Sequence, residues 1–169
     1  MDLSAITRAA LEEHLPLLRD GEHARRHGWK VDWDEANGIC YVEMQRHFGS
    51  PEVLHKYLLR LTFNYYPHEQ PGVTFVNPET RAIGAAEEFE RWWPNIDGNP
   101  WINVQINAAE PAKSYLCFQW THEFTETHGA LAADDPKKWD QERHNVVGVV
   151  AMVQRAISST HYKGYRKQP

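Results

Sequence analysis

Cys117 is the residue of this chain best suited to nucleophilic chemistry. Leu116, Phe118 and Trp120 alternate around it, so in an extended segment these apolar side chains share one face and the thiol lies on the other. A thiol away from the apolar face can be exposed, and its thiolate form is a nucleophile. The alternative interpretation is a small buried residue, because free cysteine is among the most buried residue types.

The second cysteine, Cys40, fits a core position instead. It shares its face with Val42 and Met44 in an alternating apolar stretch. Two cysteines do not make a disulfide framework, so we expect a reduced, cytoplasmic protein in which a free thiol is available for chemistry.

Two histidines, His122 and His128, follow Cys117 in a polar stretch, and His122 is the catalytic candidate of the two. Either can act as a general base or as a partner that tunes the thiol, and a solvated polar loop is the alternative. A metal-dependent hydrolase built on His122, Glu123 and His128 is the weakest hypothesis. Its His-Glu-x-x-x-x-His spacing differs from the His-Glu-x-x-His zinc helix, and no thiol pair accompanies it. We therefore expect no metal and no cofactor.

The strands that must position these residues follow from period-two alternation. Alternating apolar residues predict strands at 29–33, 39–44, 57–65, 73–75, 102–106 and 115–120. Asn37-Gly38 predicts a hairpin turn between the first two. Between 77 and 100 several prolines and glycines predict irregular structure with a short helical turn near Trp93.

The helices are expected at the two ends of the chain. Ser4 can cap a first helix, which Pro16 should end or kink near Leu15, and residues 21–27 form a polar connector. The stretch 121–135 shows no clear period. 

Near the C-terminus, Asp135 is expected to cap a helix that has Pro136 in its first turn. A core-facing stripe then follows at helical spacing, formed by Val146, Val150, Val153 and Ile157. The polar tail from Ser158 should be frayed. Together these elements predict an α+β fold in which an N-terminal helix and a C-terminal helix cover one face of an antiparallel meander.

Composition limits the function classes. A chain of 169 residues with 41% hydrophobic residues fits one domain spanning 1–169. Its formal net charge of −5 argues against nucleic acid or an anionic membrane as a partner. No apolar run reaches the roughly 18 residues that a membrane span needs, and the N-terminus lacks the apolar region of a secretory signal.

The segment from Tyr57 to Phe75 resembles the middle of the ubiquitin-conjugating-enzyme fold. In that family a strand runs into a Tyr-Pro turn, here Tyr66 and Pro67, and a second proline, here Pro71, precedes the next strand. The resemblance implies a ubiquitin-conjugating-enzyme-like fold with a four-stranded or slightly larger meander.

Two later features are also similar to that family. Cys117 between Leu116 and Phe118 is similar to the family's active-site motif, a cysteine flanked by apolar residues. Trp139 ahead of the helix at 146–157 is similar to the tryptophan that precedes a helix after the family's cysteine. The short C-terminus and the degenerate motifs look like bacterial relatives of these enzymes. Those relatives occur in antiviral operons, including the cyclic-oligonucleotide signalling type, where the C-terminus of a nucleotidyltransferase is conjugated.

The resemblance implies that Cys117 carries the C-terminus of a ubiquitin-like or other tailed protein as a thioester and passes it to an amine. In the family an asparagine in a His-Pro-Asn motif supports the oxyanion. The nearest match here is Asn95, after Trp93 and Pro94, and the insert before Cys117 also offers Asn99, Asn103 and Asn107.

Two further pairs have open assignments. Asp134 and Asp135 can orient an incoming amine, as an acidic residue does in the family, or they can cap a helix. Trp92 and Trp93 can wall a tail-binding groove or support the core.

The implied partners are a ubiquitin-like protein or a nucleotidyltransferase C-terminal tail, together with an activating enzyme that uses the ATP. The alternative function is a non-catalytic binding module of the same fold, which recognises a ubiquitin-like protein or a partner enzyme.

Overall fold

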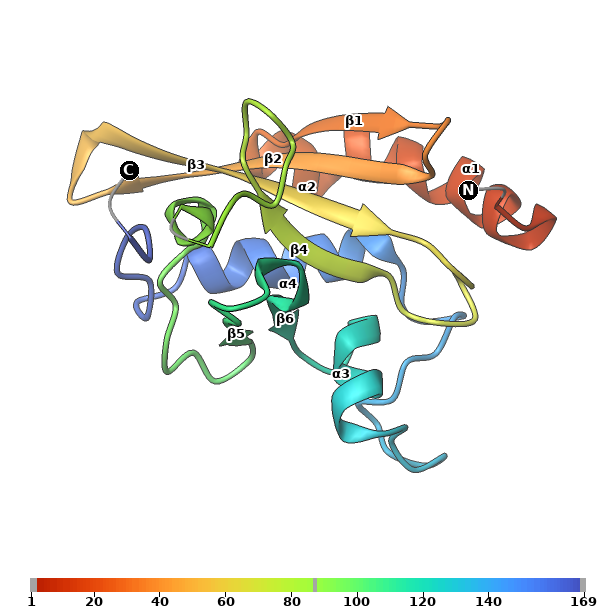
Figure 1. The fold of residues 1–169 in the computed structure, drawn as a ribbon. Coiled ribbons are helices and arrows are strands. Elements are labelled where there is room, and N and C mark those ends of the chain that lie inside the picture. Colours follow the sequence, from red (N-terminus) through yellow and green to blue (C-terminus); the bar gives the residue numbers. More distant parts are fainter. Residues whose placement is uncertain (1–2, 87, 168–169) are drawn as a thin grey trace.

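The computed structural model describes residues 3–86 and 88–167, and Figure 1 shows the arrangement of their helices and strands. The elements are α1 (Ala5–Asp20), α2 (Glu22–His27), β1 (Lys30–Asp34), β2 (Ile39–Phe48), β3 (Ser50–Thr62), β4 (Gly72–Val76), η1 (Phe89–Trp92), β5 (Asn103–Gln105), η2 (Pro111–Lys113), β6 (Tyr115–Cys117), α3 (His122–His128) and α4 (Val146–Ile157). No helix among these is long and apolar enough to cross a membrane.

The main sheet has four antiparallel strands in the order β1-β2-β3-β4, so the predicted α+β layout with a meander is confirmed. Gly38 and Gly49, both at positive φ, turn the chain between β1 and β2 and between β2 and β3. The short strands β5 and β6 form a separate antiparallel pair beyond the β4 edge (Figure 1).

One face of the sheet carries the main core. Alternation along β2 and β3 turns Cys40, Val42 and Leu59 inward, where they are fully buried, and α1 and α4 lie across this face (Figure 1). The predicted stripe on α4 is confirmed, because Val146, Val150, Val153 and Ile157 all have no exposed surface. 

The opposite face of the sheet carries a smaller cluster of Tyr41, Leu58 and Val76. The guanidinium of Arg81 lies 4.6 Å from the Tyr41 ring centroid and pairs with Asp32. The loop after β4 therefore covers part of this second face.

The Tyr66–Pro67 turn connects the sheet to the C-terminal half. The Tyr66 hydroxyl accepts a 3.0 Å hydrogen bond from the Val146 backbone N–H at the start of α4, and it also lies 2.6 Å from His14 Nδ1 on α1. The Trp139 indole N–H donates to the Pro67 carbonyl at 2.7 Å. These buried bonds fix both helices against the end of β3.

The first helix does not end near Leu15 as predicted, because α1 continues through Pro16 to Asp20. Pro16 is on the exposed face, where water can satisfy the Glu12 carbonyl that loses its donor. Burial of Leu11 and Leu18 on the opposite face outweighs that loss. The predicted cap is confirmed, since the Ser4 hydroxyl accepts from the Thr7 N–H at 3.1 Å.

The predicted connector at 21–27 is also wrong, because this segment contains the short helix α2. Gly28 ends it in the left-handed conformation at φ 67°, and Ala24 packs into the core. The neighbouring basic side chains of Arg25 and Arg26 stay in solvent.

The predicted helix start at Asp135 is wrong. The Asp135 carboxylate accepts from the Lys137 N–H at 2.8 Å within a turn, and the helix begins only at Val146. Asn145 is its cap, because its side-chain oxygen accepts from the N–H groups of Val147 and Gly148 at 3.0 and 3.2 Å.

The described part of the C-terminal tail, 158–167, packs against the sheet rather than fraying. Tyr162 is 4% exposed and its hydroxyl lies 2.6 Å from that of Tyr57 on β3. Tyr165 pairs with Pro94 in a β-bridge, and Arg166 forms an ion pair with Asp97 at 2.8 Å. Aromatic contacts to the sheet therefore override the polar composition of this segment.

Candidate active site

Cys117 is the last residue of β6, opposite Asn103 on β5. Leu116 and Phe118 are buried in the core at 0% and 2% exposure, whereas Cys117 keeps 8% and Asn103 is exposed. The alternation expected from the sequence is therefore present. The thiol lies on the same side of the pair as the Asn103 side chain, but it is buried, as the alternative interpretation of the sequence expected.

The helix α3, which the sequence did not reveal, returns the chain to this thiol. The buried Thr121 hydroxyl is placed between the carbonyls of Leu116 and Phe118, at 3.0 and 2.9 Å, and so ties the end of β6 to the start of α3. His128 is the last residue of α3, and its Nδ1 lies 3.9 Å from Cys117 Sγ. The helix docks through polar contacts, so its sequence needs no apolar stripe. Without such a stripe the hydrophobic pattern did not indicate a helix here.

The His128 ring is held in place by its own helix. It stacks on Phe124 with ring centroids 4.7 Å apart, and its Nδ1 lies 3.3 Å from the Phe124 carbonyl oxygen. The exposed imidazole thus has a defined orientation next to the thiol. A carbonyl oxygen can only accept, so Nδ1 carries the ring proton while it donates to Phe124; it can act as a general base for the thiol in the other tautomer, in which Nε2 carries that proton.

Burial raises the pKa of the Cys117 thiol, and the negative charge of Glu123 raises it further. Near neutral pH the thiol is therefore protonated, and it needs a base such as His128 before it can act as a nucleophile. Cys40 is fully buried, and burial raises the pKa of its thiol to about 12. The expectation that Cys40 is a core residue is confirmed.

His122, the histidine that the sequence favoured as a site residue, lies away from the thiol. Its Nδ1 is 3.6 Å from a carboxylate oxygen of Glu69 and its Nε2 is 3.2 Å from one of Glu126. Of the two histidines it is His128 that contacts Cys117. The rings of His122 and His128 are six positions apart on α3, which is most of two helical turns. They therefore have different neighbours.

In the sequence Glu123 stands out only within the metal motif, yet in the structure it is the carboxylate of this region with the largest pKa shift. One of its oxygens accepts from the Val73 N–H at 3.0 Å, while the other is buried without a hydrogen-bond partner among the described residues. Burial raises its pKa to about 7. The glycine at position 72 is the feature of the sequence that could have indicated this close approach of Glu123 to β4. A Cβ at Gly72 would lie 3.1 Å from Glu123 and 2.4 Å from the Thr62 hydroxyl.

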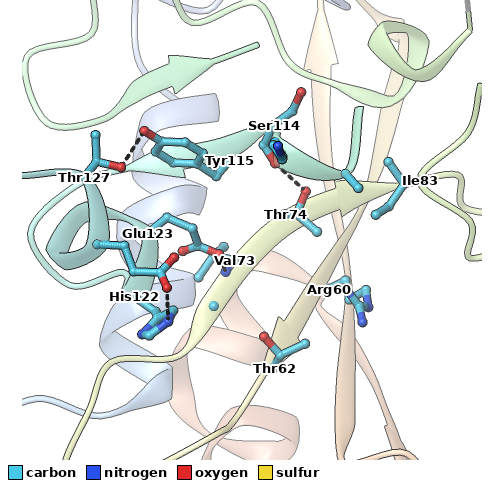
Figure 2. Close-up of a pocket in the computed structure, with 14 residues that line it drawn as sticks. Arg60, Thr62, Val73, Thr74, Ile83, Ser114, Tyr115, His122, Glu123 and Thr127 are labelled. Carbon is cyan, nitrogen blue, oxygen red and sulfur yellow. Dashed lines mark hydrogen bonds and ion pairs between the residues drawn. The ribbon is translucent and has the colours of Figure 1, made fainter. Parts of the chain in front are cut away.

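Glu123 borders a cavity of about 320 Å³ between α3 and the sheet (Figure 2). Figure 2 shows Glu123 pointing from α3 toward Val73, with Thr62 and Arg60 on the neighbouring strand. The Tyr115 and Thr127 hydroxyls, 2.9 Å apart, join β6 to α3 at the edge of the cavity. A polar cavity thus lies beside the segment that carries the thiol.

Asn95 is held by the C-terminal tail. Its N–H donates to the Gly164 carbonyl and its carbonyl accepts from the Lys163 N–H, both at 2.8 Å, and its side-chain oxygen is buried without a partner among the described residues. The asparagine that the strand register sets opposite Cys117 is Asn103. Alternation at 102–106 predicted the strand β5, but no local pattern indicated its register with β6, which produces this pairing.

Trp93, Asp134 and Asp135, the other candidates from the sequence, lie in the core or in turns. Trp93 is fully buried and stacks edge-to-face on Phe75, so it belongs to the core. Asp134 and Asp135 lie in the turns before α4. Within 3–86 and 88–167 no group of three or more His, Cys, Asp or Glu side chains is placed to hold a metal ion.

No family model, curated protein or solved structure matches this chain. The site is therefore interpreted from its own geometry and from the motifs of the sequence.

Proposed function

We propose that this protein is a ubiquitin-conjugating-enzyme-like acyl transferase with Cys117 as its acyl carrier. The observation that carries the proposal is the 3.9 Å approach of His128 Nδ1 to Cys117 Sγ at the C-terminal end of β6. The α+β layout and the apolar-Cys-apolar step agree with the family resemblance, and a base is present where the buried thiol needs one.

In the proposed reaction, His128 takes the proton of the Cys117 thiol, and the thiolate attacks the thioester through which an activating enzyme carries the C-terminal acyl group of a tailed protein. The sulfur of the activating enzyme leaves as a thiolate and takes the proton back from His128, which leaves the imidazole neutral for the second step. An amine then attacks the Cys117 thioester. The C–S bond breaks as the C–N bond forms, His128 accepts the proton of the amine, and the Cys117 thiolate leaves. The step needs no cofactor, since the ATP is consumed by the activating enzyme.

Asn103 is the residue we propose for the oxyanion that forms during this attack. It is exposed and directly opposite Cys117, so its amide N–H can reach a carbonyl bound to Sγ. Asn95, the match by motif, uses its backbone to hold the tail. Asn103→Ala should slow aminolysis of the thioester by about 100-fold, whereas Asn95→Ala should affect stability more than this rate.

As acyl donor we propose a ubiquitin-like protein or the C-terminal tail of a nucleotidyltransferase, in a bacterial antiviral system of the cyclic-oligonucleotide signalling type. This part of the proposal rests on the sequence resemblance. The formal charge of −5 agrees with a protein partner rather than nucleic acid.

The test is formation of a thioester adduct. The protein is incubated with an activating enzyme, ATP and the tailed partner, and the products are separated on non-reducing gels. A thiol-sensitive adduct that Cys117→Ser loses and Cys40→Ser keeps supports the proposal. A thiol-sensitive adduct that persists in Cys117→Ser contradicts it, whereas a thiol-resistant adduct of that variant is the oxygen ester expected of a serine at the acyl-carrying position.

A non-catalytic binding module of the same fold is the second candidate. It is favoured by the 8% exposure of Cys117 and by the raised pKa of its thiol, both of which reduce reactivity. In the same experiment, binding of the tailed partner without any adduct from the wild type would support this module.

A further inference from the structure

A second cavity, of about 540 Å³, lies along the outer surface of α4, facing α2. Its volume is in the range of small-molecule sites. Gly148 and Ala151 contribute the smallest side chains of its lining, so the α4 backbone is open to an occupant there. An added Cβ at Gly148 would meet no atom within 4 Å.

Aromatic rings form the sides of this cavity. Trp101 and Trp120 come from the loops that flank β5 and β6, and His23 and His27 come from α2. The two imidazoles are stacked with ring centroids 6.3 Å apart, and His27 stacks in turn on Trp29 at 5.9 Å. These planar walls favour a flat, apolar occupant that can stack on them.

The ionisable groups that line the cavity are all basic. They are His23, His27 and Arg155, and no carboxylate is among the lining residues although the chain carries a formal charge of −5. Arg155 is exposed, its guanidinium lies 3.9 Å from the Trp101 ring centroid, and no described carboxylate pairs with it. Stacking on one face leaves the N–H edge of a guanidinium available for an anion.

We propose that this cavity binds a small aryl carboxylate, with its ring against the tryptophans and its carboxylate on Arg155. The guanidinium of Arg155 selects an anion, and the aromatic walls select a planar ring over an aliphatic chain. The site is separate from the proposed acyl transfer, because none of its lining residues is Cys117, His128 or Asn103.

The test uses three naphthalene probes that share the ring and carry one polar group of different charge: 1-naphthoate, 1-naphthylmethylammonium and 1-naphthalenemethanol. Isothermal titration calorimetry with the whole protein should show binding of 1-naphthoate, with the neutral and cationic probes weaker by about tenfold or more. Octanoate should also bind more weakly than 1-naphthoate. Equal affinity for the three naphthalene probes, or no binding of 1-naphthoate, overturns the proposal.

Substitutions at Gly148 and Arg155 locate the site. Gly148→Leu should fill the cavity and abolish binding, while Gly148→Ala should keep most of the affinity; both should raise the melting temperature, since glycine is a poor helix former. Arg155→Gln should lose the preference for the anion. Undiminished 1-naphthoate binding by Gly148→Leu overturns the proposal, and unchanged binding by Cys117→Ser shows that the site is independent of the thiol.

Discussion

At the residue scale, the chemistry of the site depends on a balance between Cys117, Glu123 and His128. Burial and the charge of Glu123 keep the thiol protonated, and His128 is the group within reach that can take the proton. Glu123, with a pKa of about 7, loses its own charge as the pH falls. The same carboxyl therefore links the state of the thiol to the stability of the fold.

Removing the nitrogens of His128 should lower the reactivity of Cys117. His128→Phe keeps a ring that can stack on Phe124 but removes the base, so alkylation by iodoacetamide at pH 7 should slow by about tenfold. Mass spectrometry of the folded protein measures this rate at Cys117, because Cys40 is fully buried.

His122→Phe is the matched control for this experiment, since His122 contacts Glu69 and Glu126 instead of the thiol. It should leave the alkylation rate unchanged. Equal rates for His128→Phe and the wild type would remove the base from the proposed mechanism.

Glu123 should make the protein less stable as the pH rises. Its folded pKa of about 7 lies above the ordinary value of 4.5, so between these values the folded state binds a proton that the unfolded state has released. The free energy of unfolding should therefore fall between about pH 4.5 and 7, by up to about 3 kcal/mol, and stay low above pH 7.

Urea unfolding at a series of pH values checks this dependence. Glu123→Gln keeps an oxygen for the Val73 N–H but cannot ionise, so it should be more stable than the wild type above pH 7 and equal to it near pH 4.5. Glu52→Gln, at an exposed carboxylate of β3 that is not among the groups acting on Glu123, is the control and should follow the wild type. A parallel pH profile for Glu123→Gln and the wild type would show that another group is responsible.

At the scale of elements, the docking of α3 on β4 decides where His128 lies. Two contacts hold the start of this helix: the Thr121 hydroxyl bonds to the end of β6, and Glu123 accepts from the Val73 backbone N–H. The Thr127 hydroxyl holds its last turn to Tyr115 on β6. Gly72 provides the room for Glu123, because a Cβ at this position would overlap the Thr62 hydroxyl and approach the Glu123 carboxyl. A polar helix of seven residues is thus fixed by polar contacts along its length.

Gly72→Ala should destabilise the protein by about 1–3 kcal/mol, because the new methyl group would lie 2.4 Å from Thr62 Oγ1. The double variant Thr62→Ala with Gly72→Ala removes that overlap and should recover part of the loss. Denaturant unfolding of the single and double variants measures both effects. Additive losses in the double variant would show that the close approach does not limit this position.

At the scale of the whole molecule, the C-terminal tail closes the fold against the sheet. The hydroxyl of Tyr162 lies 2.6 Å from both the Tyr57 hydroxyl and His55 Nδ1, and the Arg46 guanidinium lies 4.9 Å from its ring centroid. The tail also holds Asn95 through two backbone hydrogen bonds. Residues more than 100 positions apart in the chain therefore depend on one another.

Tyr162→Phe should cost about 1–3 kcal/mol of folding free energy, because it leaves the buried Tyr57 hydroxyl without a partner. The double variant Tyr57→Phe with Tyr162→Phe should be more stable than the sum of the two single losses, since it removes both polar groups. Equilibrium unfolding gives these free energies, and limited proteolysis should cut the tail of Tyr162→Phe faster. A tail that is cleaved equally fast in the wild type would contradict this account.

Local sequence by itself determined the main sheet and the presence of an N-terminal and a C-terminal helix. Alternation at 57–65 and 73–75, the Asn-Gly turn and the helical stripe ending at Ile157 each encode an element through the spacing of apolar residues, which survives in the folded protein. The same alternation assigned Cys40 to the core and Cys117 to the outer face, because side chains on a strand point to opposite sides.

Tertiary structure alone decided which polar residues meet. His128 rather than His122 reaches the thiol, and the residue across from Cys117 is Asn103 rather than Asn95, because helix docking and strand register bring together positions that no local pattern links. Burial likewise carried α1 past Pro16 and drew the polar tail onto the sheet. These outcomes depend on contacts between distant segments, whose free energy outweighs the local propensities that the sequence displays.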